Sequence, residues 1–116
     1  MEVNPKMGRA RKPRPKRLAE KLRWVRVAAF SISQEEMVRR LGYAAEEMPR
    51  EYISRWELGT HEPPLEVLLR YSEICRCWIN AFVDDAVDLP ERLPGPGQKM
   101  HEGIRHTSNE QGKRKK

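Results

Sequence analysis

Apolar residues recur at helical spacing along the middle of the chain. Leu18, Leu22, Val25 and Ala29 follow one another at intervals of four, three and four, which predicts a helix over about 16–29. The same reasoning, with proline, glycine and serine as boundary signals, predicts four further helices over about 34–41, 49–58, 64–76 and 78–86. The sequence contains no strand-like alternation of useful length. The pattern therefore predicts an all-α fold of five short helices.

Boundary residues mark the ends of two neighbouring helices. Ser33 is followed three residues later by Glu36, which is a capping box and predicts a helix start at this point. Gly42 supplies the left-handed position that ends this helix, and Pro49 suits the first position of the next. The stretch 43–48 between them holds good helix formers and leaves room for one further turn.

The helix over 49–58 combines an apolar face with polar ones. Tyr52, Ile53 and Trp56 share the apolar face, and their spacing predicts that they are buried in the core rather than stacked on bases. Arginine can bond two acceptors of guanine and glutamate can accept from cytosine, so the polar faces suit a major groove. The segments 34–41 and 49–58 thus predict a helix-turn-helix. Its expected base-reading residues are Arg50, Glu51, Ser54 and Arg55.

Charge is distributed unevenly along the 116 residues, whose formal net charge is +6. Residues 1–17 hold seven basic side chains and one acidic one, and residues 98–116 hold six and two, whereas 18–97 hold ten and fourteen. We therefore expect a basic N-terminal arm over 1–15, a folded domain over 16–93 and a basic disordered tail over 94–116. Two roles for the arms stay open, namely solubility and contact with nucleic-acid phosphates.

Two cysteines and three histidines raise the question of a metal. Cys75 and Cys77 are too close for an ordinary disulfide, and on a helix their side chains are about 200° apart, so they cannot face one ion. Both are expected to be small core or surface residues. His101 and His106 fall in the expected tail. We expect no metal and no cofactor.

The remaining chemistry-bearing residues point away from catalysis. The sequence has no glycine-rich phosphate loop and no nucleophile or zinc motif, so we expect no enzyme. The acids Asp84, Asp85 and Asp88 are expected to form a solvated helix end. No leader-like or membrane-spanning apolar run is present, so we expect a cytoplasmic, nucleoid-associated protein that does not bind membranes.

Four segments together resemble the family of phage repressors and Cro proteins, often called the XRE family. The segments follow in the family's order: Leu22–Arg26 (LRWVR), Ser33–Gly42 (SQEEMVRRLG), Ile53–Gly59 (ISRWELG) and 62–69 (EPPLEVLL). One difference concerns the turn, because ten residues separate Gly42 from Ile53 where the family usually has about five. The resemblance implies a repressor-like DNA-binding domain.

The resemblance also implies roles by position. Arg50, Glu51 and Arg55 fall where the family reads base edges. Arg26 and Glu57 match a family pair that links its first and third helices, and we expect them to form a salt bridge. The residues expected to contact phosphates are Ser33, Gln34, Thr60 and His61.

These observations favour a sequence-specific regulator of transcription that binds double-stranded DNA through the helix over 49–58. A homodimer is expected because a single small module reads few bases, and no small-molecule ligand is expected. The candidate dimer surface is formed by Trp78, Ile79, Phe82, Val83 and Leu89. Two alternatives stay open: a DNA-binding antitoxin or interaction module of a toxin–antitoxin-like pair, and non-specific coating of nucleic acid by the tails.

Overall fold

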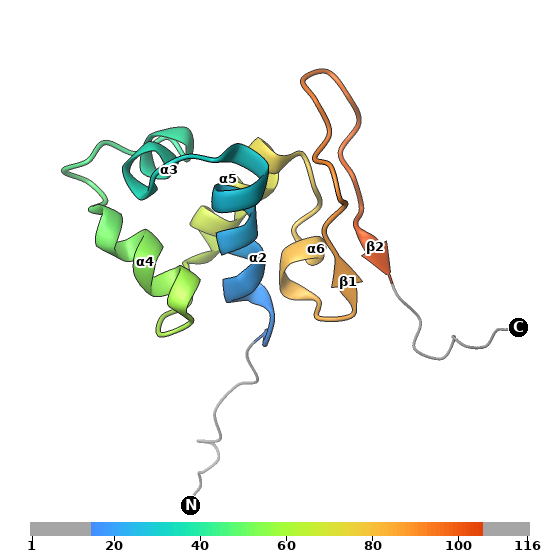
Figure 1. The fold of residues 1–116 in the computed structure, drawn as a ribbon, viewed down its shortest axis with the longest axis horizontal. Helices are drawn as coiled ribbons and strands as arrows, with labels where there is room; N and C mark the ends of the chain where they lie inside the picture. Colours follow the sequence, from blue (N-terminus) through green and yellow to red (C-terminus); the bar gives the residue numbers. More distant parts are fainter. Residues whose placement is uncertain (1–14, 106–116) are drawn as a thin grey trace, which may run out of the picture.

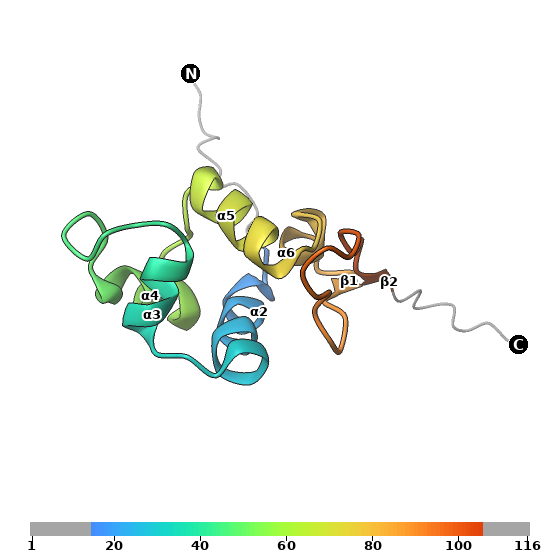
Figure 2. The same ribbon diagram turned by 90° about the horizontal axis from the view of Figure 1, so that it is seen from above.

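A computed structural model describes residues 15–105 as a predominantly helical domain with one small sheet (Figure 1). In Figure 2, α2 lies between the pair α3 and α4 on one side and the segment of α6 and β1 on the other. The helical elements are α2 (Leu18–Trp24), the π-helix η1 (Val25–Phe30), α3 (Gln34–Arg40), α4 (Arg50–Leu58), α5 (Leu65–Cys75) and α6 (Asn80–Val83). The strands are β1 (Val87–Asp88) and β2 (Ile104–Arg105).

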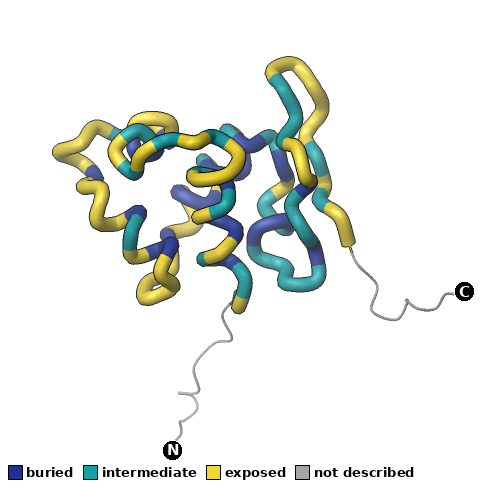
Figure 3. Tube along the Cα trace, in the orientation of Figure 1, coloured by how far each residue is buried: buried dark blue, intermediate teal, exposed yellow. Residues whose placement is uncertain are grey.

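One hydrophobic core joins all of the helices (Figure 3). The burial of this apolar surface is the main favourable contribution to folding. Its largest fully buried side chains include Tyr71 and Phe82, whose rings meet at a centroid distance of 6.4 Å. The other fully buried large side chains are Leu22, Met37, Leu41, Ile53, Val25, Val67, Val87, Cys75 and Cys77.

The first predicted helix is present, but it changes type half-way. α2 ends at Trp24 and continues as the π-helix η1, which closes at Ser31 in the left-handed conformation (φ 56°). A π-helical turn contains more residues than an α-helical one, so it rotates the following side chains out of the α-helical register. Ala29, which the apolar stripe placed in the core, is therefore exposed.

The long turn between α3 and α4 is anchored to the domain at both of its ends. Near its start, the Arg70 guanidinium donates to the Leu41 carbonyl at 2.8 Å and lies over the Tyr43 ring, 4.8 Å from the centroid. Gly42 has φ +92°, and a Cβ there would collide with Arg70. Near its end, Met48 is buried in the core. The extra residues relative to the family pattern therefore project from two fixed points.

Beyond α5 the chain differs from the expected helix over 78–86. Arg76 adopts the left-handed conformation (φ 54°) and ends α5. α6 is confined to Asn80–Val83 and is followed by a turn into β1. Phe82 is fully buried, so it cannot belong to the dimer surface expected from the sequence.

Residues 94–105 fold back onto the domain, although the sequence placed them in a disordered tail. β2 pairs antiparallel with β1, and the backbone of His101 bonds to Arg76 and Trp78 at 2.7 and 2.8 Å. Gly103 has φ +90°, and a Cβ there would collide with Val87, which fixes a close approach of the returning chain. The fold is therefore mainly helical, as expected, but it also contains a small sheet that the sequence did not predict. Residues 1–14 and 106–116, with the expected arm and the end of the tail, lie outside the described residues.

Candidate nucleic-acid interface

The buried side chains of α4 define which face of the helix points outward. Ile53, Trp56 and Glu57 are buried and lie within about 100° of arc on the helix. The opposite sector shows polar side chains together with one apolar one, Leu58, which is 74% exposed. This outward sector consists of Glu51, Ser54, Arg55 and Leu58.

A bidentate ion pair holds α4 against the π-helix η1. The Arg26 Nε and Nη2 atoms donate to the two carboxylate oxygens of Glu57 at 2.8 and 3.0 Å. The side chains are only 14% and 4% exposed, and the hydrogen bond to Glu57 raises the pKa of Arg26. Arg26 also donates to the Ile32 carbonyl at 2.9 Å. The Arg26 guanidinium therefore links η1 both to α4 and to the loop before α3.

Gln34 continues this network toward the protein surface. Its Nε2 donates to Glu57 and its Oε1 accepts from Arg50, each at 3.5 Å. Arg50 is also paired with Glu35, whose carboxylate lies 3.3 Å from the Arg50 Nε. The first residue of α4 is thus coupled to the first two residues of α3. The structure places the side chains of Arg50 and Gln34 side by side at the N-terminal ends of the two helices.

Tyr52 is 42% exposed, although its helical position predicted burial. It lies on the flank of α4 that faces away from α3, where it lines a shallow hollow with Trp56 and His61. The Arg55 guanidinium lies over its ring, 5.6 Å from the centroid. Burial of Trp56 in the core agrees with the sequence prediction. The aromatic ring of Tyr52 instead contacts the guanidinium of Arg55, which lies on the outward face.

The residues expected at phosphates lie at two separate places. Ser33 caps α3, and its Oγ accepts from the Glu36 N–H at 3.1 Å. Thr60 and His61 lie beyond the end of α4, where the Thr60 hydroxyl donates to the Arg55 carbonyl at 3.2 Å and lies 3.1 Å from the His61 Nδ1. Ser33 and Gln34 therefore lie near the start of α4, and Thr60 and His61 lie beyond its end.

A comparison with known families adds an independent observation. The family model described as helix-turn-helix matches residues 22–77, from within α2 to the residue that follows Arg76. Residues 22–77 form a helix-turn-helix domain of the XRE family. No curated protein and no solved structure gives a match.

Membership of the XRE family supports a DNA-binding regulator, and domains of this type are not typically enzymatic. The resemblance stated from the sequence motifs is thereby confirmed.

The match contains every residue that the sequence assigned to the ion pair, to bases or to phosphates. Within residues 15–105, none of the helices combines the length and the apolar character needed to span a bilayer.

The acids that follow α6 are not only a solvated helix end, as the sequence led us to expect. The Asp85 carboxylate accepts the backbone N–H groups of Lys16 and Arg17, and these bonds lower its pKa. Asp84 accepts from the Ala86 N–H and from Arg105, which lowers its pKa too. The sequence showed the acids but could not show the partners Lys16, Arg17 and Arg105, which are far away along the chain.

The two cysteines are free thiols in the core. Burial raises the pKa of Cys75 and of Cys77, the latter to about 11, so neither favours the reactive thiolate. In the part of the chain that the structure describes, no group of three His, Cys, Asp or Glu side chains is arranged to hold a metal ion.

Proposed function

We propose that this protein is a sequence-specific regulator of transcription whose helix α4 enters the major groove of duplex DNA. One observation carries the proposal. The buried Arg26–Glu57 pair fixes α4 from behind, and its opposite face carries Arg55, Glu51 and Ser54. A rigid helix with polar groups on one outward sector is what direct readout of base edges requires.

The proposed contacts divide into base reading and positioning. Arg50, Glu51, Ser54 and Arg55 read base edges. Arginine suits the O6 and N7 atoms of guanine, and glutamate suits the amino group of cytosine. Ser33 and Gln34 at one end of α4, and Thr60 and His61 at the other, contact phosphates that fix the register.

The charges on the domain determine which parts of the chain contribute to its affinity for DNA. The acids Glu35, Glu36 and Glu51 lie among the arginines of α3 and α4, so this face offers no uniform attraction for phosphates. We therefore expect α4 to discriminate between DNA sequences. The basic terminal segments are expected to supply much of the salt-dependent affinity.

We further propose that the protein binds as a homodimer to two related half-sites, because one module contacts few base pairs. Of the candidate dimer surface, Trp78 supports this best since it is 51% exposed beyond the end of α5. Ile79, Val83 and Leu89 are partly buried against the core and contribute less.

A selection from random duplexes tests the proposed function. The wild-type chain is expected to enrich a two-fold symmetric sequence. The variant Arg55→Ala is expected to relax one position of it, at a cost of about 1–3 kcal/mol in discrimination. Arg92→Ala is the matched control, because Arg92 is an exposed arginine outside α3 and α4. Enrichment of no consensus by the wild-type chain would contradict sequence-specific recognition.

A further inference from the structure

The N-terminal entry into the fold lies beside the end of α4. Pro15 and Lys16 line a hollow together with Gly59 and His61, which lie in the loop after α4. The packing is close, since a Cβ on Gly59 would lie 3.5 Å from the Cβ of Ala19. Figure 1 shows the start of α2 and the loop after α4 at the same edge of the domain. Pro15, where the described part of the chain begins, therefore lies close to Gly59 and His61 in the loop after α4.

This entry point is fixed by a carboxylate that is distant in the sequence. The two Asp85 oxygens accept the backbone N–H groups of Lys16 and Arg17 at 2.9 and 3.0 Å. The Arg17 Nη1 donates in addition to the Asp85 carbonyl at 3.0 Å. Two main-chain bonds to one carboxylate define the direction of the backbone as well as its position.

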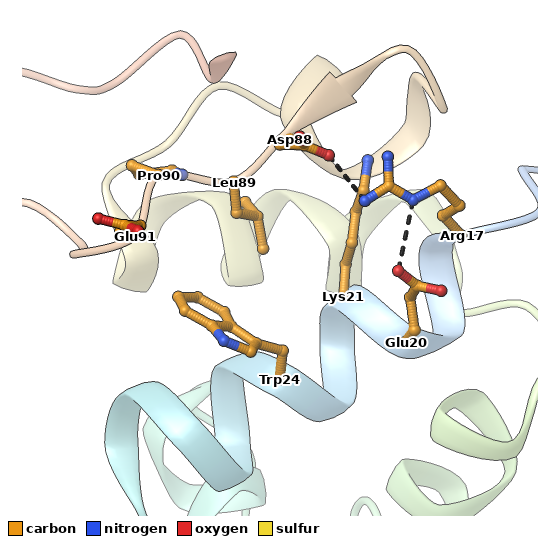
Figure 4. Close-up of a pocket in the computed structure, with 8 residues that line it drawn as sticks. All are labelled: Arg17, Glu20, Lys21, Trp24, Asp88, Leu89, Pro90 and Glu91. Atoms are coloured by element: carbon orange, nitrogen blue, oxygen red, sulfur yellow. Dashed lines mark hydrogen bonds and ion pairs between the residues drawn. The ribbon is translucent and has the colours of Figure 1, made fainter. Parts of the chain in front are cut away.

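The Arg17 side chain strengthens the same attachment. Its Nη2 lies 2.7 Å from an Asp88 oxygen, and its Nε donates to Glu20 at 3.3 Å. Figure 4 shows the guanidinium held between these two carboxylates, beside the Lys21 side chain. The first residues of the domain are thus bound from both the turn after α6 and the strand β1.

The chain that precedes this point is strongly basic. Residues 1–14 contain five basic side chains, Lys6, Arg9, Arg11, Lys12 and Arg14, and one acidic side chain, Glu2. A basic segment attached at a defined place acts at a local concentration that the attachment sets, and it gains most when it starts near its target.

We propose that Asp85 is a positioning residue for DNA binding: it holds the start of α2 so that the basic segment 1–14 contacts phosphates beside those reached by Thr60 and His61. This inference rests on the proposed function, since it assumes that α4 lies on duplex DNA. It assigns a role to the turn after α6, which lies outside the residues matched by the family. The ligand is the phosphate backbone of the same duplex, which the segment binds without reading bases.

Asp84 provides a matched control for Asp85. The two carboxylates are adjacent in the sequence, but the Asp84 side chain accepts hydrogen bonds from the Ala86 N–H and from Arg105, each at 2.9 Å. Replacing Asp84 therefore perturbs the same turn without removing the two bonds to Lys16 and Arg17.

A double-mutant cycle on the full chain tests the inference. The variants are Asp85→Ala, a variant with Arg9, Arg11, Lys12 and Arg14 replaced by glutamine, and their combination. Binding to the selected duplex is followed by fluorescence anisotropy over a range of salt concentrations. Asp85→Ala is expected to weaken binding several-fold and to reduce the salt slope, whereas Asp84→Ala is expected to leave both close to wild type. In the arm-neutralised background, Asp85→Ala is expected to change nothing.

The possible outcomes distinguish a failure of the proposed DNA binding from a failure of the positioning role of Asp85. If wild-type protein fails to bind any duplex, the proposed function fails. If it binds, and Asp85→Ala has no effect or weakens binding equally with and without the basic side chains, the positioning role is overturned. Circular dichroism and thermal melting identify a variant that does not fold, and Asp85→Asn, which keeps the shape of the side chain, then replaces it.

Discussion

Both carboxylate oxygens of Glu57 are bound by the guanidinium of Arg26, at 2.8 and 3.0 Å, in a place where neither side chain has much access to water. The pair connects the buried face of α4 to the π-helix η1. Its geometry is planar and two-pronged, which arginine can satisfy and lysine cannot. The orientation of the outward face of α4 therefore depends on a contact on its hidden side.

Removing one member of this pair should destabilise the domain. In Glu57→Ala the Arg26 charge stays partly buried without its partner, and we expect a loss of about 3 kcal/mol in the free energy of unfolding. Chemical denaturation measures this loss. The double replacement Arg26→Leu with Glu57→Leu should cost less than Glu57→Ala alone, because no charge is then left unpaired. An equal or larger loss in the double variant would show that the pair itself stabilises the fold.

The sequence was sufficient where the signal is local. The capping box at Ser33 and Glu36 placed the start of α3 correctly, because a cap needs only residues within one turn. The Arg26–Glu57 contact was implied by the family resemblance and is present in the structure. The exposure of Tyr52 was missed, since the flank of α4 on which it lies faces a surface hollow rather than the core.

Contacts between distant segments could not be predicted from the pattern of apolar and polar residues. β1 and β2 are two residues each, which is too short to show alternation, and each depends on the other for its hydrogen bonds. The attachment of Lys16 and Arg17 to Asp85 joins residues more than sixty positions apart. Such contacts depend on how the helices pack, and no single segment encodes them.

Lys21 should prove more important for stability than an ordinary lysine. Its Nζ donates to the carbonyls of Ala81, Asp84 and Val87 at 2.9, 3.0 and 2.7 Å, and burial lowers its pKa. Lys21→Met leaves these acceptors without their donor, so we expect a loss of about 1–3 kcal/mol in the free energy of unfolding. Lys16→Met, at an exposed position nearby, serves as the control for chemical denaturation and should change little. Equal effects of the two replacements would contradict this role.

The buried hydroxyl of Tyr71 should be dispensable. Among the described residues, it is the buried side-chain polar atom that has no hydrogen-bond partner, and burial raises its pKa. Tyr71→Phe keeps the ring and removes the unpaired group, so the free energy of unfolding should stay equal or rise by about 1 kcal/mol. The neighbouring Ser72 hydroxyl donates to the Cys77 carbonyl at 2.6 Å, and Ser72→Ala should instead cost about 1 kcal/mol. A clear loss in Tyr71→Phe would reveal a partner for the hydroxyl, such as a bound water.

Glu35 should oppose DNA binding. Its carboxylate is paired with Arg50 at 3.3 Å, and both side chains are more than half exposed. A base edge that Arg50 reads must compete with this carboxylate for the guanidinium, and the Glu35 charge also repels the nearby DNA phosphates. Glu35→Gln should therefore tighten binding at low salt, and the gain should shrink as salt rises. Anisotropy titrations can measure this, with the exposed Glu73→Gln on α5 as control. Weaker binding by Glu35→Gln would show that Glu35 instead holds Arg50 in its binding orientation.

Acid should weaken the attachment of the N-terminal entry to the domain. Backbone hydrogen bonds, from Ala86 for Asp84 and from Lys16 and Arg17 for Asp85, lower the pKa of both carboxyl groups in the folded state. A lowered folded pKa means that the unfolded chain takes up protons first as the pH falls below about 4. The stabilisation is thus fully present above that pH and is lost as the pH falls through the folded values. The melting temperature of wild type should drop over this range, and that of Asp85→Asn should drop less, because it has lost one of the two carboxyls. Parallel pH profiles for the two proteins would mean that the bonds from Lys16 and Arg17 add no acid-sensitive stability, even though they are formed in the fold.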